Sequence, residues 1–324
     1  MNSSAKMIAT LGLARTFRGR RGDIEAVKGV DINVDAGQIF GFLGPNGAGK
    51  TTTLRMLATL LAPTAGEASV AGVDLRREPE RVRELIGYVP QGGSVNPDET
   101  GRRELVFQGR VHGMSKRAAQ LRATELLAVF ELDRAADRET VTYSGGMRRR
   151  LDIALGMVHR PRLLFLDEPT TGLDPQARAS LWEEIRRLRA SGTTIFLTTH
   201  YLDEADALCD RLAIIDAGRI VAEGTSDALK REVAGDILTI GLPIPADGLL
   251  AVMRTQPLVR EVSAGEDGVL RLRVDNGNLV LPQLLRVLDG LGVAPTSLAM
   301  ARPSLDDVFL RKTGRWLRDE IVSE

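Results

Sequence analysis

A phosphate-binding loop is the segment of this sequence with the most specific chemistry. Its residues are Gly44, Pro45, Asn46, Gly47, Ala48, Gly49, Lys50 and Thr51, and Thr52 follows directly. Glycines let the backbone curl so that successive N–H groups point at phosphate oxygens, and the N-terminus of a following helix favours the same anion. Lys50 adds a mobile positive charge near the terminal phosphates, Thr51 offers a hydroxyl to a magnesium ion, and Thr52 lies nearer the inner phosphate. The loop therefore predicts that the chain binds a nucleoside triphosphate together with Mg²⁺.

The elements around this loop stand in the order that the motif requires. An apolar run at residues 39–43 predicts a strand before the loop, and a helical run at 52–57 follows it. The alternative is a glycine-rich turn without phosphate chemistry, and the order strand, loop, helix counts against it. The loop alone leaves kinases, GTPases and helicases open.

Further motifs narrow these choices. In chain order they are Gln91, the segment Tyr143-Ser144-Gly145-Gly146-Met147, the acid pair Asp167-Glu168, the segment Gly172-Leu173-Asp174, and His200. Gln91, Asp167 and His200 each come at the end of a run that predicts a strand. In order and spacing the motifs resemble the ATP-binding cassette (ABC) ATPases, over residues 7–230.

Each of these polar side chains can be given a role. Asp167 ends a buried strand, where its carboxylate can hold magnesium through water. Glu168 lies one residue further out and can orient and deprotonate the water that attacks the terminal phosphate, so we expect it to be the catalytic base. His200 can donate a hydrogen bond to the terminal phosphate, and Gln91 can reach both the magnesium and the attacking water. The alternatives are a polar strand end with a helix cap for the acids and a solvated loop residue for Gln91.

Ser144, Gly145 and Gly146 form a second anion-binding nest at a helix N-terminus, although one triphosphate needs only one nest. In the ABC family the second nest completes the nucleotide site of a facing subunit, so that two ATP molecules lie between two cassettes. Because this chain holds one cassette, the resemblance implies a homodimer with Asp174 near the shared interface.

Some positions depart from the usual pattern of the family. Tyr143 and Met147 stand where leucine and glutamine are more common, but the Ser-Gly-Gly core between them is intact. Phe17 is the best candidate for the aromatic residue that stacks on adenine, although the family more often uses tyrosine. A core phenylalanine is the alternative for Phe17.

The pattern of apolar residues predicts an α/β fold in two domains. The first, residues 7–230, is expected to be a P-loop ABC cassette with a mixed sheet core, an antiparallel β subdomain and a helical insert at about 92–160. In the insert, the spacing of Leu121, Leu126, Leu127 and Phe130 predicts an amphipathic helix. Apolar runs at 163–166 and 193–198 flank a helical stretch at 175–190, which predicts parallel strands joined by a crossover. Short strands and helices at 232–312 predict a small separate α+β domain.

The composition limits the classes of protein to which the chain can belong. The chain has 324 residues, enough for two domains, and its acidic and basic residues balance at 43 each. This balance gives no reason to expect nucleic acid as a partner or a polybasic membrane anchor. The single cysteine, Cys209, excludes an internal disulfide, and no apolar run approaches the roughly 18 residues that span a bilayer. We therefore expect a cytoplasmic protein.

Three segments, 143–154, 167–175 and 304–310, resemble the daunorubicin and doxorubicin resistance exporters. In that subfamily a free ATPase works with a separate transmembrane permease. The resemblance implies that the chain powers export of a hydrophobic drug, antibiotic or lipid, and that the permease holds it at the inner face of the cell membrane. The alternatives are the ATPase of another ABC exporter class, for sodium or polysaccharide, and a soluble non-transport ABC ATPase.

Overall fold

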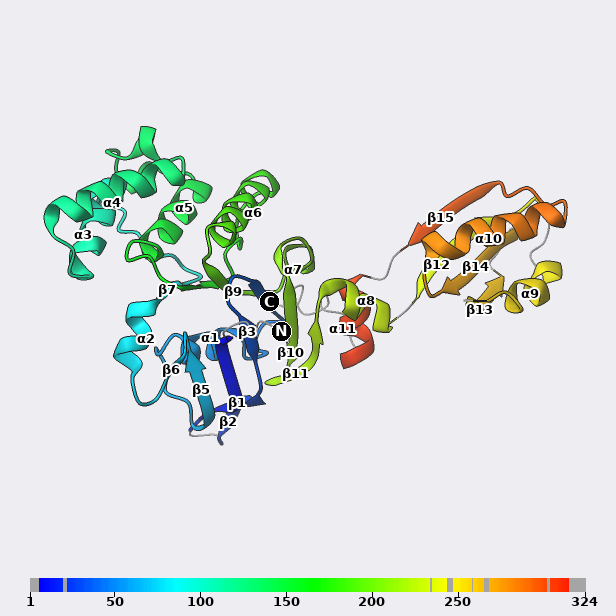
Figure 1. The fold of residues 1–324 in the computed structure, drawn as a ribbon, viewed down its shortest axis with the longest axis horizontal. Coiled ribbons are helices and arrows are strands. Elements are labelled where there is room, and N and C mark those ends of the chain that lie inside the picture. Colours follow the sequence, from blue (N-terminus) through cyan, green and yellow to red (C-terminus); the bar gives the residue numbers. More distant parts are fainter. Residues whose placement is uncertain are drawn as a thin grey trace. The chain divides into compact units, whose positions relative to one another are not determined.

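The computed structural model describes residues 6–19, 22–233, 235–243, 247–257, 259–264, 268–301 and 304–314. The chain folds as two compact units, Met1–Glu223 and Gly224–Glu324 (Figure 1). The sequence places this boundary slightly later, near residue 230. The difference arises because helix α8 (Ser226–Val233) packs against α11 (Leu305–Thr313) and so belongs to the second unit.

A six-stranded, mainly parallel sheet forms the centre of the first unit. In spatial order its strands are β11 (Arg219–Gly224), β10 (Arg211–Asp216), β4 (Ile39–Leu43), β9 (Thr194–Thr199), β8 (Leu163–Asp167) and β7 (Ile86–Val89). Every residue of β4, β8 and β9 is buried, as expected for parallel strands covered on both faces. The predicted crossover is confirmed, because β8 and β9 are parallel neighbours joined through α6 (Pro175–Ala190).

The two faces of this sheet lie against different layers. Phe165 and Phe196 belong to one core, where their ring centroids are 5.7 Å apart and pack with residues of an antiparallel sheet. The strands of that second sheet are β1 (Lys6–Phe17), β2 (Ile24–Val30), β3 (Asn33–Asp35), β5 (Ala65–Val70) and β6 (Val73–Asp74). Leu164 and Leu166 alternate with Phe165 along β8 and belong to the other core, together with residues of α5 and α6.

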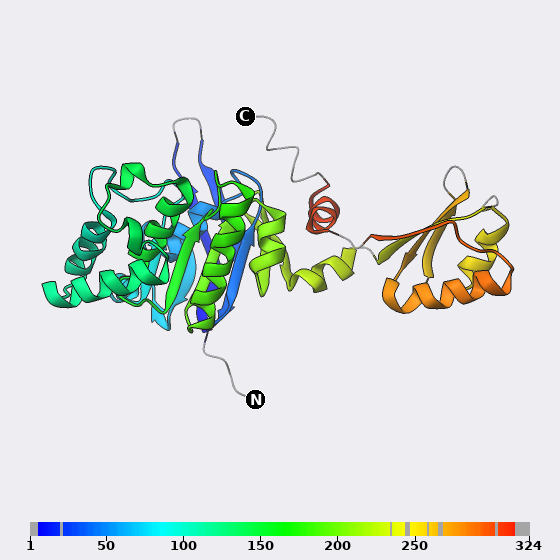
Figure 2. The same cartoon turned by 90° about the horizontal axis from the view of Figure 1, so that it is seen from above.

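Helices α3 (Gly101–Val111), α4 (Lys116–Val129) and α5 (Gly145–Gly156) lie together at one end of the first unit (Figures 1 and 2). The amphipathic helix predicted from Leu121, Leu126, Leu127 and Phe130 is confirmed as α4, and Leu126 and Leu127 are buried. Leu121 is 66% exposed, because on an α-helix it lies about 140° around the axis from Leu126. The first unit also contains α1 (Lys50–Leu57), α2 (Pro79–Leu85) and α7 (Leu202–Leu208), with short 3-10 helices at Asp133–Ala135 and Thr140–Thr142. Among all the helices that the structure describes, none has both the length and the apolar character needed to cross a membrane.

The second unit contains a four-stranded antiparallel sheet in the order β13-β14-β12-β15. Its elements follow as β12 (Asp236–Gly241), α9 (Asp247–Arg254), β13 (Val259–Ala264), β14 (Val269–Val274), α10 (Gly277–Gly290) and β15 (Ser297–Ala301). This βαββαβ order is that of the ferredoxin-like split βαβ fold. Leu238 and Ile240 of β12 share one core with Met253 of α9 and Leu284 of α10, so both helices cover the same sheet.

Candidate active site

The phosphate-binding loop, Gln91, the acid pair at 167–168 and His200 lie at the carboxyl ends of adjacent parallel strands. In the sheet, β9 lies between β4 and β8, and β7 lies beyond β8. The register pairs Leu43 with Thr199, Asp167 with Thr198, and Val89 with Leu166, so the four strand ends lie nearly level. Open α/β sheets bind their ligands at this edge.

The phosphate-binding loop joins β4 to the N-terminus of α1, and its glycines meet local requirements. A Cβ atom at Gly44 would lie 2.3 Å from the carbonyl oxygen of Ile215, and Gly49 has a φ of 104°. Only glycine fits both conditions without a shift of the backbone. Lys50 begins the helix and is 4% exposed, and its Nζ donates to the carbonyls of Gly44 and Pro45 at 2.8 and 3.0 Å. The lysine therefore folds back over the first residues of the loop, beside the backbone that would bind the phosphates of a nucleotide.

Asp167 lies at the end of β8 and is 1% exposed. Its Oδ1 accepts hydrogen bonds from the Thr51 hydroxyl at 3.0 Å and from the Thr198 hydroxyl at 2.7 Å. Carboxylate and hydroxyl oxygens are hard donors of the kind that Mg²⁺ prefers, and Mg²⁺ keeps most of its remaining ligands as water and phosphate. The Thr51 and Asp167 oxygens thus fit a magnesium ion beside the loop.

Glu168 is the residue on which the other predicted catalytic side chains converge. The Gln91 amide donates to its Oε2 at 2.9 Å, the Nδ1 of His200 lies 3.2 Å from the same oxygen, and Lys50 Nζ lies 3.3 Å from Oε1. Burial raises the pKa of Glu168, but the nearby His200 ring and the Lys50 charge outweigh burial and hold the pKa at about 2. The carboxylate is therefore ionised at neutral pH and can accept a proton.

The second nest lies at a different place, at the N-terminus of α5, and Asp174 lies at the N-terminus of α6. Ser144 is exposed and caps α5, its Oγ accepting from Met147 N at 3.2 Å, and Gly145 beside it is exposed as well. Asp174 caps α6 by accepting from Ala177 N at 2.9 Å. A Cβ atom at Gly146 would lie 3.4 Å from the Ala177 side chain, so the two helix ends are neighbours. Both ends can therefore meet one external anion or partner.

Phe17 ends β1 and is 37% exposed, with the Arg15 guanidinium 4.7 Å from its ring centroid. It pairs with Ile24 of β2, and the carbonyl of Ala26 on the same strand reaches the space beside Gly49. The hairpin that carries this ring therefore adjoins the phosphate-binding loop.

The structure adds residues that the sequence did not single out. Thr198 bonds Asp167, its hydroxyl also accepts from Glu168 N at 3.0 Å, and the Thr171 hydroxyl donates to Glu168 Oε2 at 3.2 Å. Arg149 of α5 is 7% exposed and donates to three backbone carbonyls around the site. Thr198 is one of three threonines in β9 and Arg149 is one of three consecutive arginines, so residue type alone singles out neither.

Comparisons with known proteins agree with this geometry. A family model described as ABC transporter matches residues 27–171, and one described as the C-terminal domain of DrrA1-3-like ATP-binding proteins matches residues 224–313. Daunorubicin resistance ATP-binding protein DrrA2 of Streptomyces coeruleorubidus is 45% identical, over 93% of this chain and 94% of that protein. Daunorubicin/doxorubicin resistance ATP-binding protein DrrA of Streptomyces peucetius is also 45% identical, over 98% of this chain and 96% of its own.

Solved structures match the first unit. An ATP-binding cassette solved as a dimer in a post-hydrolysis state with ADP and Pi is 26% identical, with a TM-score of 0.62, and the match covers 68% of this chain and 98% of that one. The α/β cassette fold and the family resemblance predicted from the motifs are thereby confirmed. The chain is an ATPase of the ATP-binding cassette transporter family, in the branch of the daunorubicin and doxorubicin resistance ATP-binding proteins.

Proposed function

We propose that the chain hydrolyses ATP to drive export of a hydrophobic drug, antibiotic or lipid through a separate membrane permease. The observation that carries the catalytic part is the convergence of Lys50, Gln91 and His200 on the buried carboxylate of Glu168. The names of its relatives, which are drug-resistance ATP-binding proteins, support the export part.

In this proposal Glu168 orients the attacking water and takes its proton. Gln91 and His200 hold the carboxylate and flank the terminal phosphate, and Lys50 leaves the loop carbonyls to contact the phosphate oxygens. This movement takes a positive charge away from Glu168. Lys50 is one of the groups that lower the pKa of Glu168.

Thr51 and Asp167 would hold magnesium at the edge of the loop, with Gln91 close by. Bound there, the ion would neutralise charge on the phosphates. Phe17 would stack on adenine from the neighbouring hairpin, and Thr52 would meet the inner phosphate.

We infer that two copies of the chain form the working unit. Each copy would lend Ser144, Gly145 and Gly146 to nucleotide in the loop of the other, with Asp174 at the interface. The exposed helix ends at Ser144 and Asp174 and the dimeric state of the matched cassette support this arrangement.

Changing Ser144→Arg tests the dimer, because Ser144 contacts nucleotide only across the interface in this arrangement. We expect S144R to bind ATP with an affinity within about threefold of the wild type, because Lys50 and its loop are unchanged. ATP turnover should fall by about 100-fold, because a donor that stabilises the charge on the phosphate is lost. Nucleotide titration and phosphate release measure the two quantities. Wild-type chain that hydrolyses ATP at full specific rate as a strict monomer in sedimentation would refute the dimer.

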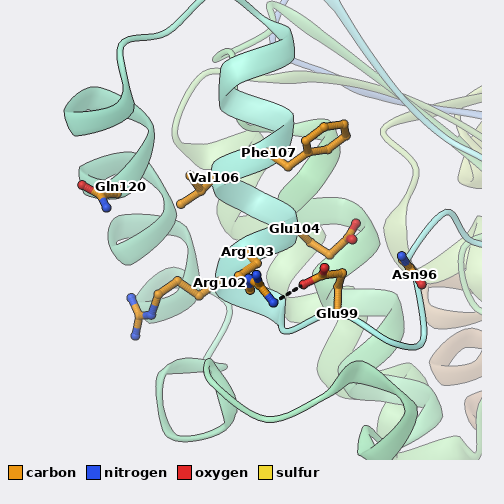
Figure 3. A pocket seen from close by; sticks show the side chains of 8 residues that line it. All are labelled: Asn96, Glu99, Arg102, Arg103, Glu104, Val106, Phe107 and Gln120. Atoms are coloured by element: carbon orange, nitrogen blue, oxygen red, sulfur yellow. Dashed lines mark ion pairs between the residues drawn. The ribbon is translucent and has the colours of Figure 1, made fainter.

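A surface cavity of about 530 Å³ on the helical segment is the place we assign to the permease. It lies between the loop before α3, helix α3 and helix α4 (Figure 3). Its lining residues are Asn96, Glu99, Arg102, Arg103, Glu104, Val106, Phe107 and Gln120. Phe107 is 66% exposed. The loop before α3 contains both Gln91 and the lining residues Asn96 and Glu99, so a cytoplasmic segment of the permease bound here would contact the same loop that carries a predicted active-site residue.

The export proposal is tested with the chain and its permease together in vesicles. A transported drug should raise the ATPase rate of the complex, and Phe107→Asp should remove this stimulation while the basal rate of the free chain stays unchanged. Leu11→Asp, at a side chain of matched exposure on β1, serves as the control. Stimulation by sodium or polysaccharide instead of hydrophobic compounds would assign the chain to another exporter class.

A further inference from the structure

Helix α5 places one arginine inside the catalytic site. The guanidinium of Arg149 donates from Nε to the carbonyl of Pro169 at 2.8 Å, from Nη1 to that of Pro90 at 2.7 Å, and from Nη2 to that of Asp167 at 3.0 Å. These carbonyls precede Gln91 and flank Glu168 on both sides. One side chain therefore binds the backbone of both segments that carry the predicted catalytic residues.

Arg149 is 93% buried, so its charge has left water at a considerable cost. A guanidinium has five N–H donors in a rigid plane, and a fork of this shape can hold several carbonyls in one fixed arrangement. The acids Asp152 and Asp167 lie close enough to favour its charge. Burying this charge costs more free energy than burying an apolar side chain that would pack the helix equally well.

Asp152 lies three residues further along the same helix and is 5% exposed. Its Oδ1 accepts from the backbone N of Ser94 at 2.7 Å and from the Ser94 hydroxyl at 3.1 Å. The segment from Pro90 to Ser94, which contains Gln91, is thus fixed to α5 at both ends.

The backbone at Glu168 needs such support. Glu168 has a φ of 44°, in the left-handed region that a glutamate rarely adopts. Conformations of this kind persist where the surroundings hold them from several sides. Arg149 binds the carbonyls before and after this residue, and Thr198 binds its N–H.

We propose that Arg149 is a positioning residue for ATP hydrolysis, which sets Glu168 and Gln91 relative to α5, the helix that Ser144 caps. It touches no substrate and acts through the three carbonyls. The inference rests on the proposed function, in which Glu168 and Gln91 act on the water and the terminal phosphate.

The test compares Arg149→Met and Arg149→Lys with Arg122→Met in the full-length chain. Arg122 is the matched control, because it is 11% exposed at its side chain and donates to the carbonyls of Met157 and Val158 at 2.7 and 3.1 Å, away from the site.

We expect R149M to lower kcat by about tenfold or more with the ATP Kd within about threefold of the wild type, since misplacing a reacting group costs rate and not affinity. R149K keeps the charge but not the fork, and should fall between R149M and the wild type. R122M should keep kcat within about twofold at a similar loss of Tm.

Wild-type kcat in R149M and R149K would overturn the inference, and so would a fall in kcat no larger than that in R122M at equal Tm. An ATP Kd that weakens as much as kcat falls would also overturn it. If R149M does not fold, R149K decides by the same criteria. Failure of the proposed function is distinguishable, because it would show as no hydrolysis by the wild type, or as undiminished hydrolysis by E168Q.

Discussion

Glu168→Gln should abolish ATP hydrolysis while the protein still binds ATP. The amide has the same shape as the carboxylate and can still meet Gln91 and Thr171, but it cannot accept a proton from water. General bases contribute about 10²- to 10⁴-fold to a rate, so we expect turnover to fall by about 10³-fold. Binding should persist, because Lys50 and the loop are intact and the negative charge next to the phosphates is gone. Without hydrolysis, Mg²⁺ and ATP should also hold two copies together.

Phosphate release, titration with a fluorescent ATP analogue and light scattering after gel filtration measure these three effects. Glu183→Gln is the control, because it makes the same change at an exposed acid of α6. Turnover near the wild-type rate in E168Q would assign the catalytic base to another residue.

Lys50→Ala should weaken ATP binding and stop hydrolysis together. The Lys50 ammonium is buried against Glu168 and the loop carbonyls, so it places a positive charge at the loop that would bind the phosphates. Losing a charged contact of this kind should cost about 1.5–3 kcal/mol, which corresponds to about 10- to 100-fold in the ATP Kd. Turnover at saturating ATP should fall by about 10²- to 10³-fold, because charge stabilisation of the transferred phosphoryl group is lost.

The pattern of losses separates the two variants. In K50A both the Kd and kcat change, whereas in E168Q only kcat changes. K50A also removes a charge that lowers the pKa of Glu168, so the carboxyl pKa should rise in the variant, as carboxyl titration by NMR can show. Lys6→Ala, at an exposed lysine of β1 paired with Asp35, should change none of these quantities. ATP affinity in K50A equal to the wild type would exclude Lys50 as a phosphate contact.

Local motifs made much of the first unit predictable. The phosphate-binding loop and the acid pair at 167–168 are contiguous, so their residue types alone indicate what they bind. The ends of apolar runs located Gln91 and His200 at one sheet edge, because parallel strands share their carboxyl ends. Lys50, Gln91 and His200 converge on Glu168 and not on Asp167. This arrangement depends on the positive φ of Glu168, which the pattern of apolar residues does not encode.

Other features depend on tertiary contacts that local sequence patterns do not reveal. Arg148, Arg149 and Arg150 are the same residue type, and the sequence does not show that Arg149 is the one that faces the carbonyls of Pro90 and Pro169. Leu121 fits an apolar spacing but points to solvent. The boundary between the units shifts because α8 and α11 meet from distant parts of the chain.

The strand order of the central sheet also determines when the protein can acquire its activity during synthesis. Strand β4, which carries the phosphate-binding loop, pairs with β9 near residue 195 and β10 near residue 212, and both lie late in the unit. A ribosome-bound chain must therefore emerge beyond β10 before the loop has its two neighbours. Until then β4 is an apolar segment whose edges are not both paired. Nascent chains of this length should therefore depend on chaperones more than longer nascent chains that include β10.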